Sequence, residues 1–279
     1  MNLDNIVRKA SQTLKNHNIH SHELDAQIIL SDIMKIKREL LLINDEVSIS
    51  EKILKKYDMA IKRRVKREPV AYITGKKEFW SQDFAVNNST LIPRPESELL
   101  IYKLINRFKN KRINILDIGT GSGCILLSLL KELYLARGIG IDISSKAVKT
   151  ARFNSKKFNL FYRSKFKVFN IDDFNFGRYD LIVSNPPYIA LKDMKNLSKD
   201  ILDYEPLIAL KGGLDGLDLI KKVIYKSKYL LKSNGLLGME VGTNQYLKVL
   251  NILKANGFRE IHKEYDNNCN VRCIISTKT

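Results

Sequence analysis

Tyr179-Asp180-Leu181-Ile182-Val183-Ser184-Asn185-Pro186-Pro187-Tyr188 is a short apolar run that is stopped by two prolines. Such a run predicts a buried strand that ends abruptly, and an open α/β sheet binds its ligands at the carboxyl ends of its strands. At this end Asn185 offers an amide acceptor and donor, Pro186 a carbonyl with no competing N–H, and Tyr188 a flat ring. Two acceptors beside an aromatic plane suit a planar –NH2 group. Taken alone, the tetrapeptide is equally compatible with a plain turn, since Asn-Pro and Pro-Pro are common turn dipeptides.

Strands and helices alternate from residue 113 onward. This alternation predicts an α/β fold in which a mostly parallel sheet carries helices on both faces. The predicted strands are 113–118, 138–141, 165–169, 179–184, 235–241, 258–265 and 271–276, and the predicted helices are 124–133, 145–154, 214–231 and 243–256.

Residues 3–67 show helical periodicity without a convincing strand pattern, and Ser21 and Ser50 are placed to cap two of the helices. Glu68-Pro69 breaks this pattern. We therefore expect a small all-helical N-terminal domain at 1–67.

Two further segments connect this helical part to the alternating region. Residues 71–75 and 78–86 are interpreted as two short strands about a glycine turn, which makes 68–90 a β-hairpin linker. Leu91-Ile92-Pro93-Arg94-Pro95-Glu96-Ser97-Glu98 is a stiff extended loop that leads into a helix at 99–108. The α/β domain is accordingly expected to span 91–279.

Gly119-Thr120-Gly121-Ser122-Gly123 follows the first strand of the alternating region directly and opens a helix. A glycine-rich turn here lets a ligand approach the backbone and the helix N-terminus, but GxGxG is not the GxGxxG spacing of a dinucleotide pyrophosphate site. Asp142, at the end of the next strand, is placed to accept hydrogen bonds from ribose hydroxyls, and Asp172 from an exocyclic adenine amine. An adenosine joined to an amino acid fits this order, so we expect S-adenosylmethionine as the cofactor and no metal.

The composition of the 279 residues, 44% hydrophobic and 28% charged, is that of a soluble globular protein. No apolar run approaches the length of a membrane span, the N-terminus lacks a signal-peptide pattern, and Cys124, Cys269 and Cys273 show no CxxC spacing. We therefore expect a cytoplasmic protein with reduced thiols and no membrane partner. The net charge of +18 favours a polyanionic neighbour only weakly, because a codon bias toward Lys would also produce it.

Thr120-Gly121-Ser122-Gly123, Asp142 and Asn185-Pro186-Pro187-Tyr188 together resemble the class I methyltransferases that act on planar nitrogens. Three more stretches make the chain similar to the HemK/PrmC family, the protein-(glutamine-N5) methyltransferases of peptide chain release factors. These stretches are 67–75 (REPVAYITG), 91–98 (LIPRPESE), and Tyr204-Glu205-Pro206 with 209–217 (ALKGGLDGL).

The resemblance implies a class I, Rossmann-like S-adenosylmethionine-dependent methyltransferase domain and a helical domain that docks the release factor. The methyl acceptor would be the glutamine of the Gly-Gly-Gln loop of class I release factors, and S-adenosylhomocysteine would be the product. Asp173 stands where the family often has an aromatic residue, so adenine packing would fall to Phe174 or another group. The resemblance places catalysis at Asn185, Pro186 and Tyr188, the cofactor at Gly119, Thr120, Gly121, Ser122, Gly123, Asp142, Asp172, Asp173 and Asn185, and the substrate at Asn185, Pro186, Pro187, Tyr188 and Arg94.

Three other functions are compatible with single features of the chain. An adenine-N6 DNA methyltransferase shares Asn-Pro-Pro-Tyr and suits the basic charge, but it usually needs a recognition segment, and no insertion here is large enough. For this reason we expect no stable DNA partner. A basic RNA- or ribosome-binding protein with a degenerate α/β domain is disfavoured because every cofactor position carries a competent residue. A nicotinamide dehydrogenase is disfavoured by the glycine spacing.

Overall fold

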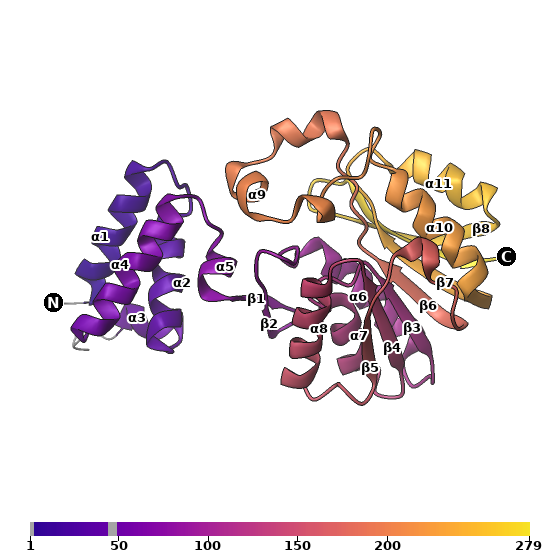
Figure 1. Cartoon of the computed structure of the whole chain (residues 1–279), viewed down its shortest axis with the longest axis horizontal. Coiled ribbons are helices and arrows are strands. Elements are labelled where there is room, and N and C mark those ends of the chain that lie inside the picture. Colours follow the sequence, from indigo (N-terminus) through magenta and orange to yellow (C-terminus); the bar gives the residue numbers. More distant parts are fainter. Residues whose placement is uncertain (1–2, 44–48) are drawn as a thin grey trace. The chain divides into compact units, whose positions relative to one another are not determined.

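The computed structural model describes residues 3–43 and 49–279, whose elements are labelled in Figure 1. The chain divides into two compact units. One comprises residues 1–76 together with 198–204, and the other comprises 77–197 together with 205–279.

The first unit is helical and has its own apolar core. Leu14, Ile29, Leu30 and Tyr57 are fully buried in it, and the Tyr57 hydroxyl donates to the Ala26 carbonyl at 3.0 Å. Its helices are α1 (Leu3–Asn16), α2 (His22–Met34), α3 (Arg38–Ile43), α4 (Glu51–Val65), α5 (Val70–Thr74) and α9 (Lys199–Tyr204).

The two predicted helix caps have different outcomes. The Ser50 hydroxyl accepts from the Ile53 N–H at 3.4 Å, which is the cap predicted for α4. Ser21 precedes α2 but makes no side-chain cap, because its φ and ψ angles of −84° and 21° are not the extended ones of a capping residue; its hydroxyl donates to the Asp25 carboxylate at 2.8 Å.

The helix α9 belongs to this unit although it lies far along the chain. Arg64, nearly buried on α4, donates from Nε to Asp25 and from Nη1 to Asp200 on α9, both at 2.7 Å. The Tyr204 hydroxyl donates to the Lys66 carbonyl at 2.7 Å. A buried guanidinium with two carboxylate partners therefore ties α9 to α2 and α4.

The strand predicted at residues 71–75 is wrong. Residues Val70–Thr74 form the short helix α5, which starts after Pro69 and ends at Gly75 in the left-handed region, with φ +72°. The hairpin lies later, between β1 (Lys76–Phe79) and β2 (Gln82–Ala85). It turns at Trp80 and Ser81, whose φ angles of +51° and +53° are those of a tight two-residue hairpin turn.

The second unit is built on a seven-stranded sheet with the order β5-β4-β3-β6-β7-β9-β8. The strands from β5 to β7 are parallel, whereas β9 runs antiparallel between β7 and β8. The strands are β3 (Asn114–Ile118), β4 (Arg137–Asp142), β5 (Ser164–Val168), β6 (Tyr179–Ser184), β7 (Leu231–Glu240), β8 (Phe258–Tyr265) and β9 (Val271–Lys278). The α/β sheet predicted from the sequence is thus confirmed.

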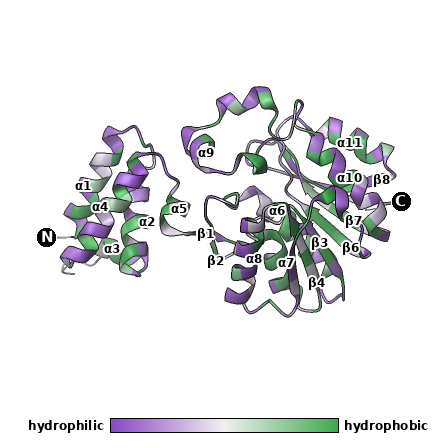
Figure 2. Ribbon diagram, in the orientation of Figure 1, coloured by the Kyte–Doolittle hydropathy of each residue, from purple (hydrophilic) through white to green (hydrophobic). Residues whose placement is uncertain are grey.

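Helices cover both faces of this sheet, and the central strands are mainly hydrophobic (Figure 2). Successive side chains on a strand point to opposite faces, so Leu181 and Val183 pack in one core and Ile182 in the other. The first core involves α6 (Glu96–Phe108), α7 (Cys124–Glu132) and α8 (Ser145–Lys157), and the second involves α10 (Asp218–Leu230) and α11 (Tyr246–Ala255). The described helices include none with the length and apolar character needed to cross a membrane.

Candidate active site

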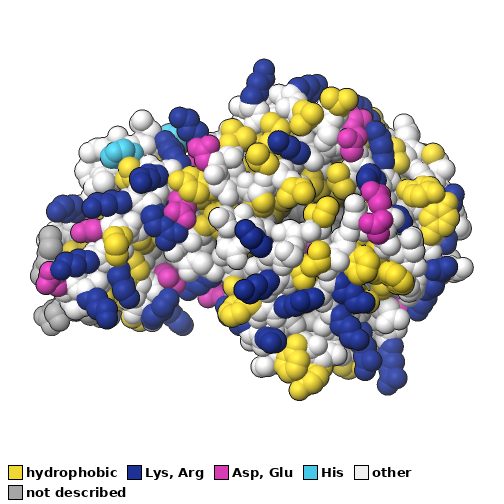
Figure 3. All heavy atoms as spheres, viewed as in Figure 1, with side chains coloured by type: hydrophobic (Ala, Val, Ile, Leu, Met, Phe, Trp, Pro, Cys, Tyr) yellow, Lys and Arg dark blue, Asp and Glu magenta, His cyan; other side chains and the backbone are white. Residues whose placement is uncertain are grey.

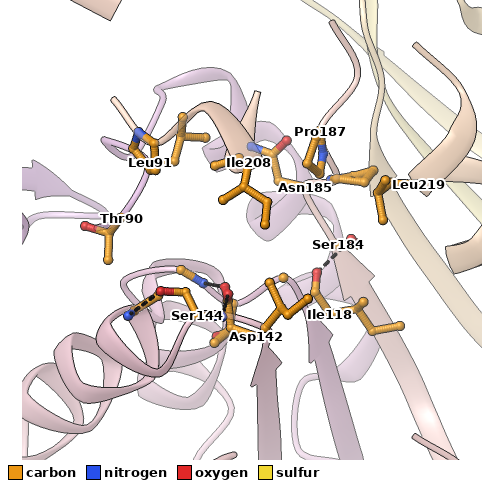
Figure 4. Close-up of a pocket in the computed structure, with 18 of the residues that line it drawn as sticks. Thr90, Leu91, Ile118, Asp142, Ser144, Ser184, Asn185, Pro187, Ile208 and Leu219 are labelled. Atoms are coloured by element: carbon orange, nitrogen blue, oxygen red, sulfur yellow. Dashed lines mark hydrogen bonds between the residues drawn. The ribbon is translucent and has the colours of Figure 1, made fainter. Parts of the chain in front are cut away.

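A cavity of about 590 Å3 lies at the carboxyl ends of β3, β4 and β6 (Figure 4). The chain passes from β3 to β4 on one side and later returns to β6 on the other, so the strand order reverses here. Ile118, Asp142 and Ser184 line the cavity at the three strand ends. This is the switch point at which open α/β sheets bind ligands.

The glycine turn after β3 opens onto this cavity. Gly119 and Gly121 have φ angles of +74° and +54°, and a Cβ built on either would meet no atom within 4 Å. Thr120 and Ser122 are buried and also line the cavity, and the Thr120 hydroxyl donates to Asp117 at 2.7 Å. The turn therefore presents bare backbone to a ligand.

Gly123 has a different function from the two other glycines. It is the N-cap of α7, with φ +82°, and a Cβ there would meet Ala151, Leu127 and Phe166 at 3.2 Å. It lies outside the cavity lining, where it allows α7 to pack closely against α8 and β5.

Asp142 ends β4 and faces the cavity with both oxygens engaged by backbone. Oδ2 accepts from the Gly121 N–H and Oδ1 from the Ser144 N–H, each at 2.9 Å. Burial raises the pKa of this carboxyl, while the N–H donors of Ser144 and Gly121 act in the opposite direction. The same carboxylate thus shapes the glycine turn and offers its remaining lone pairs to a ligand.

The two aspartates predicted near the third strand do not reach the cavity lining. They lie in the 3-10 turn η1 (Ile171–Asp173), where both are exposed and Asp172 pairs with Lys222 at 2.5 Å. Asn170 and Ile171 line the cavity instead. Asn170 Oδ1 accepts the Asp172 N–H at 3.1 Å, so the turn brings the residues before the aspartates to the site and directs the carboxylates outward.

The aromatic residue that lines the cavity is Phe169. Phe174, one of the candidates to pack against adenine, is instead buried in the core of the sheet, with only 1% of its surface exposed. Phe169 contacts it edge-on, with ring centroids 5.5 Å apart.

Asn185 and the two prolines that follow line the cavity at the end of β6. The Asn185 amide donates from Nδ2 to the Ser97 hydroxyl at 3.2 Å. Among the described residues, no donor occupies either Asn185 Oδ1 or the Pro186 carbonyl. Two acceptors at the cavity are therefore available to a ligand.

Tyr188 is only three residues after Asn185, but it does not line the cavity. Its hydroxyl donates to Glu240 at 3.1 Å and accepts from Arg272 at 2.9 Å, and the Arg272 guanidinium lies 5.5 Å from its ring centroid. Burial raises the pKa of Tyr188 well above its usual range. In this structure the ring is part of a polar cluster behind the site.

Arg94 lines the cavity from the extended loop that precedes α6. Its Nη2 donates to Glu205 at 2.6 Å, and the second oxygen of Glu205 accepts the Ile92 N–H at 3.1 Å. Glu205 is only 4% exposed. A nearly buried carboxylate thus holds the loop and its arginine in place.

The glycines at 212 and 216 allow a second loop to pack against the Asn-Pro-Pro-Tyr turn. A Cβ on Gly216 would lie 2.3 Å from the Tyr188 carbonyl, and one on Gly212 would lie 2.8 Å from the Pro187 carbonyl. The Gly212 N–H donates to the Ile189 carbonyl at 2.8 Å. Only glycine permits this close approach of two backbones.

Sequence reasoning missed Glu240, which ends β7 and is fully buried. Its Oε2 accepts from the Ser97 hydroxyl at 2.5 Å, and its Oε1 accepts from Tyr188. A lone acidic residue in the apolar run Leu236–Val241 was the signal that could have found it, since an unpaired buried charge is costly. Within residues 3–43 and 49–279, no three His, Cys, Asp or Glu side chains form a group that could hold a metal ion.

Comparison with known proteins identifies both parts of the chain. Residues 5–75 match the PrmC N-terminal domain, and residues 109–240 match a methyltransferase domain. A release factor glutamine methyltransferase of Buchnera aphidicola subsp. Schizaphis graminum is 38% identical over 100% of both chains. One of Clostridium acetobutylicum is 37% identical over 95% of each chain.

A solved structure supports the fold alone. A methyltransferase from Pyrococcus furiosus superposes with a TM-score of 0.55 at 16% identity, covering 78% of this chain and 96% of the other. Together with the full-length relatives, these matches show that the chain belongs to the HemK/PrmC family of release factor glutamine methyltransferases.

Proposed function

We propose that this enzyme transfers a methyl group from S-adenosylmethionine to the side-chain amide nitrogen of the glutamine in the Gly-Gly-Gln loop of class I peptide chain release factors. The observation that carries the proposal is the pair of acceptors at the end of β6, Asn185 Oδ1 and the Pro186 carbonyl. An amide –NH2 group has two hydrogens to donate, and these two oxygens can accept both.

The cavity fits S-adenosylmethionine by the chemistry of its lining. The backbone at Gly119 and Gly121 leaves room that a side chain would fill, which suits the amino-acid end of the cofactor. The Asp142 carboxylate suits the ribose hydroxyls. Phe169 and Ile171 offer apolar surface for an adenine ring, and we assign them this role in place of Asp172 and Asp173.

When bound, S-adenosylmethionine supplies an electrophilic methyl group. An amide nitrogen is a poor nucleophile because its lone pair is delocalised into the carbonyl. Asn185 and Pro186 accept both N–H hydrogens and thereby raise the electron density on that nitrogen. The same two hydrogen bonds orient the substrate amide relative to the methyl group. Asp142 is the sole carboxylate in the described lining, and two backbone donors already engage it. The methylated nitrogen carries one proton more than the neutral product and loses it to solvent water. Catalysis then rests on position and electrostatics rather than on a strong general base.

We assign the remaining roles by domain. The helical domain, expected at 1–67 and joined in the structure by α5 and α9, docks the release factor. The segment 68–90, which contains the β1–β2 hairpin, links it to the catalytic part, and 91–279 apart from α9 carries methyl transfer. Tyr188 lies outside the cavity lining and contributes through its hydrogen bond to Glu240. Arg94 lines the cavity and is assigned to the substrate. Cys124, Cys269 and Cys273 are free thiols, which suits action in the cytoplasm, where translation terminates.

The DNA alternative has no support from the relatives compared above, which are named for release factors. Lys and Arg side chains are spread over the visible face rather than gathered in one stripe (Figure 3). A duplex-reading enzyme would be expected to concentrate its basic residues along the groove that it binds.

The test uses methyl-labelled S-adenosylmethionine and three acceptors: an intact release factor, the same factor with the loop glutamine replaced by alanine, and duplex DNA. We expect label on the intact factor and none on the other two. Equal labelling of the intact factor and the Gln→Ala factor would contradict the assignment of the acceptor, and labelling of DNA alone would contradict the proposed function.

A further inference from the structure

A line of hydrogen bonds runs from Asn185 through Ser97, both of which line the cavity, to the buried Glu240. Asn185 Nδ2 donates to Ser97 Oγ at 3.2 Å, and Ser97 Oγ donates to Glu240 Oε2 at 2.5 Å. Ser97 lies in the first turn of α6 and is 2% exposed, and Glu240 is 0% exposed. Three elements distant in sequence therefore meet at the proposed methyl acceptor site, with Glu240 behind its lining.

At the other end of this line, Tyr188 and Arg272 keep Glu240 as a hydrogen-bond acceptor. Tyr188 donates to its Oε1 at 3.1 Å, and Arg272 Nη2 lies 3.6 Å from the same oxygen. Burial raises the pKa of Glu240, aided by the Glu96 charge, while the hydrogen bonds from Ser97 and Tyr188 and the charge of Arg272 act in the opposite direction. The ionised carboxyl can accept from both Ser97 and Tyr188 and attract the Arg272 cation.

The direction of each hydrogen bond follows from the number of hydrogens available. A serine hydroxyl has one hydrogen, and Ser97 gives it to the carboxylate. Ser97 can then only accept from Asn185, so the nitrogen of that amide must face Ser97 and the oxygen must face the cavity. The two ends of an asparagine amide have nearly the same shape, which means that hydrogen bonds decide its orientation.

We propose that Glu240 is a positioning residue, which acts through Ser97 to hold the Asn185 amide with its oxygen toward the substrate. The inference rests on the proposed function, because a substrate amide that donates two hydrogens requires acceptors. A reversed Asn185 would present its own N–H groups to those of the substrate. The hydroxyl at position 97 is needed for this relay, while the rest of that side chain is not.

Glu240→Gln tests the relay with almost no change of shape. The introduced amide nitrogen donates to Ser97, which then turns its hydrogen toward Asn185 and reverses that amide. We expect kcat on a release factor to fall about 10- to 100-fold. The KM for the release factor and the affinity for S-adenosylhomocysteine are expected to stay near their wild-type values.

A double-mutant cycle separates a relay from a general effect of the buried charge. In the Ser97→Ala background the relay is already broken, so Glu240→Gln should add no further loss of kcat. An undiminished loss in that background would overturn the inference, as would a wild-type kcat for Glu240→Gln alone. Ser97→Thr restores the hydroxyl and should recover the turnover lost in Ser97→Ala, a comparison that stands even if Glu240→Gln does not fold.

The orientation of the Asn185 side-chain amide can also be determined without a release factor or any other methyl acceptor. A crystal structure of the Glu240→Gln variant at about 1 Å resolution or better distinguishes the amide oxygen from the nitrogen. A reversed amide supports the inference, and an unreversed one overturns it. If the wild-type enzyme methylates no release factor, the proposed function is refuted. The orientation of Asn185 in the variant crystal structure would still test whether Glu240 acts through Ser97.

Discussion

Asp142→Asn removes one acceptor from a carboxylate that has two backbone donors. Oδ1 and Oδ2 accept the Ser144 and Gly121 N–H groups, each at 2.9 Å, and an asparagine has a single oxygen for both. Either the Gly121 or the Ser144 N–H then faces an NH2 group, and the negative carboxylate proposed to accept hydrogen bonds from the ribose hydroxyls is lost. Hydrogen bonds to a charged group contribute about 1.5–3 kcal/mol, so we expect the Kd for S-adenosylhomocysteine to rise about 10- to 100-fold.

The stability of the free protein should change less than its affinity for the cofactor. Burial raises the pKa of Asp142, so its charge carries a desolvation cost that the neutral amide relieves. Titration calorimetry measures the Kd, and circular dichroism checks the fold. Asp173→Asn is the matched control, because that carboxylate is exposed and lies outside the cavity lining. An unchanged Kd for Asp142→Asn, or an equal rise in both variants, would refute the reasoning.

Three further predictions concern turnover, pH and stability. Asn185→Ala should lower turnover about 100-fold or more while the affinity for S-adenosylhomocysteine stays near wild type, and an equal loss of both would contradict the separation of roles. Burial raises the pKa of Asp117 to about 7, so the folded protein keeps a proton that the unfolded chain releases, and this contribution to stability is lost as the pH rises toward that value. The stability of Asp117→Asn relative to wild type, measured by thermal unfolding, should therefore rise by about 2–3 kcal/mol between pH 5 and 8, and a constant difference would be contrary evidence. Arg64→Ala leaves Asp25 buried without its cation and should cost about 3–5 kcal/mol in urea unfolding. The exposed pair lost in Arg63→Ala should cost at most about 1 kcal/mol, and similar values for the two variants would argue against the buried pair.

The sheet and its ligand-binding edge could be predicted because their signals are local. Apolar runs that stop at Gly119, Asp142 and Asn185 indicate strand ends, and the carboxyl ends of neighbouring parallel strands meet at one edge. No knowledge of distant contacts was needed to bring these residues to a common cavity.

The errors arose where local signals conflict or end. Residues Val70–Thr74 contain β-branched residues, yet Pro69 and Gly75 impose a helix start and a helix stop. After the third strand of the alternating region, Asn170 lines the cavity where Asp172 was expected. The short turn makes this difference of two residues, which sequence periodicity does not resolve.

The network behind Asn185 could not be predicted because its contacts are long-range. Ser97 and Glu240 are 143 residues apart, and Tyr188 and Arg272 are 84 apart. Sequence alone predicted that Tyr188 would face the ligand, whereas its hydroxyl is engaged by a carboxylate and a guanidinium that only the folded sheet brings near.

The most direct test of the proposed chemistry is tandem mass spectrometry of a release factor after reaction with S-adenosylmethionine that carries a deuterated methyl group. We expect one labelled methyl on the side-chain amide nitrogen of the loop glutamine, with the wild-type chain and not with Asn185→Ala. A labelled methyl on a different residue or atom of the factor, or on the same glutamine with undiminished yield from Asn185→Ala, would contradict it.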